Sequence, residues 1–80
     1  MALDNLMYFY KKYILCDNLE GRFNILIDYL TLEQQMCEVF EIDLTVAEML
    51  DIYEIQDFME EYNDFIIMQF KMLLRLLGDD

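Results

Sequence analysis

The stretch from Thr45 to Gly78 carries a helical pattern long enough to constrain the rest of the fold. Thr45 and Glu48 have the spacing of a capping box, in which both side chains bond backbone amides at a helix start. Gly78 is a natural left-handed C-cap. Between these residues, apolar side chains recur at three- and four-residue steps and share one helical face: Ile52, Ile55, Met59, Tyr62, Ile66, Phe70, Leu73 and Leu77.

This pattern predicts an amphipathic helix over residues 46–77, about 48 Å long at about 1.5 Å per residue. A compact domain of 80 residues is only about 30 Å across. The helix is therefore expected either to break, most plausibly near Asn63, or to project into a partner or a second copy. The sequence leaves both arrangements open.

The remaining chain also favours helices, because it contains no proline and only two glycines. Residues 3–15 predict a first helix. A second helix runs to Glu41 and starts either near Asn18 or after Gly21. We expect a single acidic all-α domain over residues 1–80, built as a small bundle of three to four helices with a long C-terminal amphipathic helix.

Charge is distributed unevenly along the chain. The net charge is −12, and no Lys or Arg lies between residues 23 and 70, although acidic residues occur throughout that segment. Such a charge disfavours direct binding to nucleic acid or to an anionic membrane surface. The complementary partner is a basic protein.

Composition also limits the cellular compartments in which the protein is expected. Cys16 and Cys37 are too few for a disulfide framework, and the first residues lack the features of a signal peptide. The longest nearly apolar run, residues 65–77, is too short to cross a hydrocarbon layer of about 30 Å. A cytoplasmic protein without a membrane span is expected.

Catalytic and metal-binding patterns are missing from the sequence. Without histidine or serine, the chain contains neither a Ser-His-Asp nor a Cys-His arrangement. The di-iron bundle pattern needs a histidine, and the calcium loop needs a glycine among alternating oxygen ligands. We expect no enzymatic activity, no catalytic residue, no metal site and no cofactor.

Carboxylates line the side of the long helix opposite its apolar face. These residues, the acidic face, are Glu54, Asp57, Glu60, Glu61 and Asp64. Like charges at helical contact spacing repel by about 0.2–0.5 kcal/mol per pair, which interleaved lysines would avoid. The acidic face is interpreted either as a solvated surface kept negative for solubility or as a phosphate-backbone mimic.

Apolar side chains surround the last turns of the same helix, apart from a narrow wedge at Lys71 and Arg75. A helix that is apolar nearly all round is buried on more than one side. The segment is interpreted as the central helix of the bundle, a dimer seam or an anchor in a partner's groove. The residues proposed for self-association or groove binding are Phe65, Ile66, Phe70, Met72, Leu73, Leu74 and Leu77.

Two functional hypotheses follow from these two surfaces. The first is a non-enzymatic inhibitor that binds a basic, nucleic-acid-binding protein, such as a nuclease or a DNA-binding protein, through the acidic face. Phages and mobile elements use inhibitors of this kind against host defence. The alternative is an assembly, adaptor or oligomerisation protein of the phage assembly-chaperone type, which acts through the apolar C-terminal helix. A homodimer is expected from the apolar segment.

Overall fold

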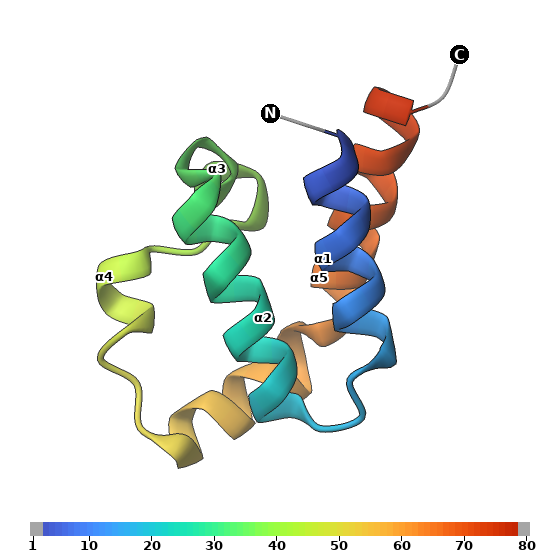
Figure 1. The fold of residues 1–80 in the computed structure, drawn as a ribbon. Coiled ribbons are helices and arrows are strands. Elements are labelled where there is room, and N and C mark those ends of the chain that lie inside the picture. The colour runs from blue at the N-terminus through green and yellow to red at the C-terminus, as the bar shows by residue number, and fades with distance from the viewer. Residues whose placement is uncertain (1–2, 79–80) are drawn as a thin grey trace.

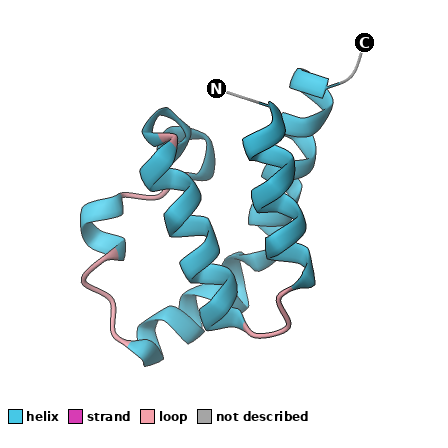
Figure 2. Cartoon of the chain, viewed as in Figure 1, coloured by secondary structure: helices cyan, strands magenta, loops and turns pink. Residues whose placement is uncertain are grey.

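A computed structural model describes residues 3–78 of the chain. These residues form helices joined by short connections, with no strand among them (Figures 1 and 2). The expected all-α bundle with a long C-terminal helix is confirmed. The elements are α1 (Leu3–Leu15), α2 (Leu19–Leu32), a 3-10 turn (Gln34–Met36), α3 (Cys37–Phe40), α4 (Leu44–Ala47) and α5 (Ile52–Gly78).

Helix α5 connects the two sides of the molecule. It starts beneath α2, turns upward and then runs antiparallel to α1 (Figure 1). Its first part packs on α2, where the rings of Phe23 and Phe58 meet edge to face at 6.1 Å between centroids. Its later part packs on α1, where the rings of Tyr10 and Phe70 lie 5.7 Å apart. The two parts of α5 thus pack on different helices, and the side of α5 turned away from both lies on the surface of the molecule.

Gly78 is not the left-handed cap that the sequence predicts, and this expectation is wrong. It is the last residue of α5, and no described glycine has a positive φ. A Cβ atom at Gly78 would lie 3.3 Å from Leu3 Cδ1, closer than ordinary van der Waals contact. The glycine instead allows the last turn of α5 to approach the first turn of α1.

The second helix begins at the earlier of its two expected positions. Asn18 is the N-cap of α2, and its Oδ1 accepts the backbone N–H of Gly21 at 2.6 Å. A Cβ atom at Gly21 would lie 2.5 Å from Cys16 Sγ, so the glycine is needed for close approach in the first turn. The helix therefore includes Gly21 instead of starting after it.

The expected end near Glu41 is right, but the expectation of one continuous helix up to it is wrong, because the chain leaves the helical conformation at Glu33. Glu33 has φ −120° and ψ 72°, and Glu41 has φ 56° and ψ 44° in the left-handed region. The intervening turn directs Phe40 into the core, where its ring lies 6.1 Å from that of Tyr29. Burying these two rings together stabilises the fold, and a straight helix would not bring Phe40 to this position.

The long C-terminal helix breaks well before Asn63, so the expected position of the break is wrong. Asp43, not Thr45, is the N-cap of α4, since Asp43 Oδ1 accepts the N–H of Thr45 at 2.9 Å. A second capping box then starts α5. Asp51 Oδ1 accepts the N–H of Glu54 at 2.8 Å, and Glu54 Oε1 accepts the N–H of Asp51 at 3.0 Å. These reciprocal bonds start a new helix, which continues through Asn63.

Replacing Asp51 with alanine should lower the free energy of unfolding by about 1 kcal/mol, because the first turn of α5 loses its cap. The matched control is Thr45→Ala, which should change it by less than about 0.5 kcal/mol because the exposed hydroxyl caps nothing. Urea denaturation followed by circular dichroism measures both variants. A larger loss for Thr45→Ala than for Asp51→Ala would contradict the observed helix start.

The hydrophobic core is centred on Phe70. Its ring centroid lies 5.0 Å from that of Phe40, 5.5 Å from Tyr29 and 5.7 Å from both Tyr10 and Tyr13. Four of these five rings, all but that of Tyr10, are completely buried. One residue of α5 therefore joins α1, α2 and α3 into a single core.

Candidate functional site

The acidic face lies along the first half of α5, and all five of its carboxylates are exposed. Glu54 has a structural role as well, because its carboxylate belongs to the capping box with Asp51. No described contact neutralises the four that remain: Asp57, Glu60, Glu61 and Asp64. The acidic face therefore presents four free carboxylates and a fifth, that of Glu54, which also accepts a backbone N–H at the start of α5.

The mean spacing of these four carboxylates along the helix axis is close to that of phosphates along one strand of DNA. From Asp57 to Asp64 the helix rises about 10.5 Å at about 1.5 Å per residue, which gives about 3.5 Å of axis per carboxylate. Duplex DNA carries one phosphate per about 3.4 Å along each strand. Over residues 57–64, the mean charge density along α5 therefore matches that of one nucleic-acid strand.

Arg22 contacts α5 beside the acidic face, at Asn63, but its hydrogen bonds go to neutral acceptors. Its Nε donates to the carbonyl of Cys16 at 2.8 Å, and its Nη2 donates to the carbonyl of Ile14 at 3.2 Å. Its Nη1 donates to Asn63 Oδ1 at 3.0 Å. The guanidinium group thus holds together the end of α1 and the middle of α5.

Asn63 fixes the orientation of the acidic face. Its Oδ1 also accepts the hydroxyl of Tyr13 at 2.7 Å, and the Arg22 guanidinium lies 5.1 Å from the Tyr13 ring centroid. Burial raises the pKa of Tyr13 well above its usual range, and the charge of Asp64 raises that pKa further. Because Asn63 is fixed to α1 and α2, the adjacent carboxylates of α5 point outward. This network was not predicted from the sequence, although an uncharged residue within an acidic run was a signal for it.

The apolar residues proposed for self-association are divided between core and surface. Ile66, Phe70 and Leu73 are buried in the core of the domain. Leu74 is half-buried and packs beside them, whereas Met72 and Leu77 are exposed. Phe65 is also half-buried, and its ring lies 4.7 Å from that of Tyr62. The interpretation of this segment as the central helix of the bundle therefore holds for the three buried residues.

A row of exposed apolar side chains, the Met stripe, remains on the outer side of α5. It consists of Met68, Met72 and Leu76, with exposed fractions of 55%, 49% and 73%. Their four-residue spacing puts them on one side of the helix. Met68 and Leu76 were not among the residues that the sequence analysis selected, although this spacing was visible. Lys71 and Arg75 are exposed beside the stripe.

The other candidate chemistry is limited. Cys16 and Cys37 are free, and burial raises the pKa of the Cys37 thiol, which makes it less nucleophilic at neutral pH. Within residues 3–78, no group of three or more His, Cys, Asp or Glu side chains is arranged to hold a metal ion. No helix in the same range is long and apolar enough to cross a membrane.

Comparisons with known proteins identify no relative. No protein-family model matches the chain, and no curated protein or solved structure is similar enough to count as a match. The charge and geometry of α5 are therefore the basis for a functional proposal.

Proposed function

We propose that this protein is a non-enzymatic inhibitor that presents the acidic face of α5 as a mimic of a phosphate backbone. Its partner is a basic, nucleic-acid-binding protein such as a nuclease or a DNA-binding protein, in the manner of phage or mobile-element inhibitors of host defence. The observation that carries the proposal is the row of exposed carboxylates at about 3.5 Å of helix axis per charge.

The absence of nearby bases in the sequence supports this proposal. Residues 23–70 contain no Lys or Arg, and Arg22 bonds carbonyl and amide oxygens. Within residues 23–70, therefore, no cation competes with a partner for the four free carboxylates. A channel lined with Lys and Arg would attract this surface over long range and bind it more weakly as salt is added.

Amide substitution of the four free carboxylates tests the proposal. The variant Asp57→Asn, Glu60→Gln, Glu61→Gln, Asp64→Asn leaves Glu54 in place, so that the capping box of α5 remains. We expect unchanged helicity and an unchanged or higher melting temperature, because like-charge repulsion is removed. Binding to the partner should weaken by about a hundredfold or more. Calorimetry at several salt concentrations measures the affinity.

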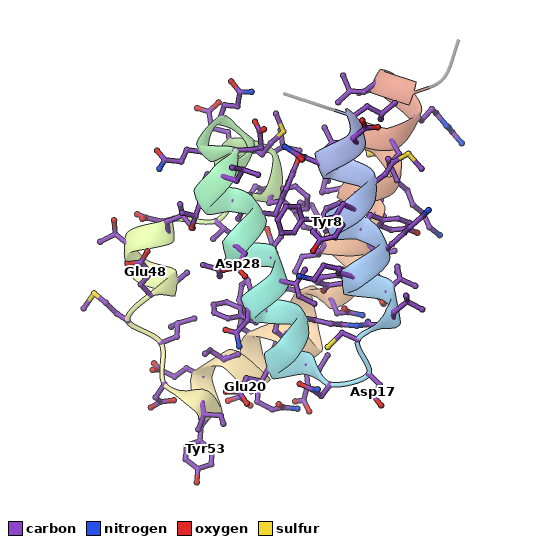
Figure 3. The ribbon with its side chains drawn as sticks, in the orientation of Figure 1. Tyr8, Asp17, Glu20, Asp28, Glu48 and Tyr53 are labelled. Atoms are coloured by element: carbon purple, nitrogen blue, oxygen red, sulfur yellow. The ribbon has the colours of Figure 1, made fainter. Side chains whose placement is uncertain are left out.

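The partner is first obtained by affinity purification from the native cell, and it must be released from the immobilised chain by duplex DNA. A matched control removes four exposed carboxylates elsewhere: Asp4→Asn, Asp28→Asn, Glu38→Gln and Glu48→Gln. Asp28 and Glu48 project from α2 and from the end of α4, away from α5 (Figure 3). Equal weakening by both variants, or a complex that DNA does not displace, would refute mimicry.

A second candidate function is self-assembly through the Met stripe, and charge complementarity favours it. Glu61, Met68 and Arg75 follow one another at seven-residue intervals, which puts them on one side of α5. In an antiparallel pair of α5 helices centred on Met68, Arg75 of each copy faces Glu61 of the other. Lys71 then lies near Asp64 of the other copy. The outer side of α5 is therefore complementary to itself, as a two-fold interface requires.

The two candidates use overlapping parts of α5. Self-pairing covers Glu61 and Asp64, which mimicry needs exposed, whereas Asp57 and Glu60 stay free in both arrangements. Assembly through the Met stripe corresponds to the oligomerisation or adaptor alternative and to the expected homodimer. The oligomeric state of the wild-type chain at micromolar concentration separates the two candidates.

A further inference from the structure

A cavity of about 280 Å³ opens between α2, α4 and the first turns of α5. Its floor is apolar and is formed by Phe23, Ile42, Ala47 and Phe58. Cavities of about 150 Å³ can hold a benzene ring, and ligand pockets begin near about 300 Å³. The cavity is therefore large enough for one large apolar side chain but small for a typical cofactor.

Exposed apolar side chains occur at this cavity and in the chain that follows it. Val46, which lines the cavity, is 56% exposed, and Met49 beyond it is 78% exposed. Ile52 and Tyr53 at the start of α5 are also exposed, and Tyr53 projects away from the body of the protein (Figure 3). An apolar hollow whose lining includes an exposed apolar side chain, here Val46, is a candidate interaction site.

Three carboxylates surround the apolar floor: those of Glu41, Asp43 and Glu54. Asp43 and Glu54 are held in place because each accepts a backbone N–H as a helix cap. No Lys or Arg occurs between residues 23 and 70 to balance them. The cavity therefore combines an apolar floor with a fixed negative rim.

We infer that this cavity receives an apolar side chain of Leu, Met or Phe from a partner segment in which Lys or Arg residues flank that side chain. The apolar group fills the floor, and the flanking cations pair with the rim. The inference rests on the proposed function, because Glu54 belongs both to the rim and to the acidic face. A basic partner lying along α5 would reach the cavity at the N-terminal end of the acidic face.

A synthetic peptide with Phe and Leu between flanking lysines is the probe. Titration into isotope-labelled protein, followed by NMR, should shift the amide signals of Val46, Leu50 and Phe58 before those of the Met stripe. A twin peptide with alanines in place of Phe and Leu should bind about tenfold more weakly, because the apolar anchor is lost. A second twin with glutamates in place of the lysines should bind at least as weakly.

Two protein variants locate the binding site. Val46→Lys puts a cation at the cavity entrance and should weaken binding of the lysine peptide about tenfold. Met49→Lys is the matched control, because it adds the same charge three residues later in the chain, outside the cavity lining. It should weaken binding by less than about threefold.

Equal binding of the alanine twin, or equal effects of the two lysine substitutions, would overturn the cavity assignment. If the peptide binds with the expected shifts but the amide variant of the acidic face still binds the partner normally, the cavity assignment stands and mimicry is refuted. Partner binding that is lost in the acidic-face variant but unchanged by Val46→Lys would retain mimicry and refute the anchor. The two failures are thus distinguishable.

Discussion

The variant Phe70→Ala should lose about 3–5 kcal/mol of folding free energy, the largest stability effect expected for a single substitution in this chain. The Phe70 ring contacts four other aromatic rings from α1, α2 and α3, and its side chain is completely buried. Its removal leaves a cavity that aromatic neighbours cannot fill without moving off their preferred rotamers. The total free energy of unfolding of a native protein is only about 5–15 kcal/mol, so this substitution removes a large part of the stability.

Chemical denaturation of the variant and the wild type measures this loss. Tyr53→Ala is the matched control, because it removes an aromatic ring from the same helix at a position that is 79% exposed. The control should change the stability by less than about 0.5 kcal/mol. Similar losses for both variants would mean that α5 does not pack on the other helices through Phe70.

The second large effect concerns assembly. If the Met stripe is a seam between two copies, the wild type sediments as a dimer at micromolar concentration. The variant Met68→Gln, Met72→Gln, Leu76→Gln then sediments as a folded monomer, because these side chains are exposed within one copy. A wild-type monomer, or a variant that stays dimeric, would exclude this seam.

A charge exchange tests the antiparallel pairing itself. Arg75→Glu and Glu61→Arg should each weaken the dimer, because each puts like charges opposite one another across the pair. The double variant should restore it. Within one chain these residues are about 21 Å apart along α5, at about 1.5 Å per residue, so the restoration cannot arise within a single copy. Double-variant affinity no better than that of either single variant would refute the pairing.

The sequence by itself determined the helical class and the two chemical characters of α5. Periodicity predicted α1 with its observed bounds, and the absence of proline favoured helices throughout. The positions of the carboxylates on the acidic face follow from helical spacing alone, and all five are exposed. These features are local, because they depend on residues three or four positions apart.

Tertiary structure alone decided where the chain after α2 breaks into further helices and which apolar residues are buried. The sequence contains several residue pairs with capping spacing, and the structure uses Asp51 and Glu54, not Thr45 and Glu48, as the capping box. The left-handed turn at Glu41 and the burial of Phe40 likewise depend on rings distant in sequence.

The same distinction applies to the surfaces that could bind a partner. A run of apolar residues around a helix does not specify which of them face the core, because that depends on how many neighbouring helices cover it. Here α1, α2 and α3 cover Ile66, Phe70 and Leu73 and leave the Met stripe outside. The cavity beside Val46 is formed by three separate elements, so no local pattern in the sequence could have predicted it.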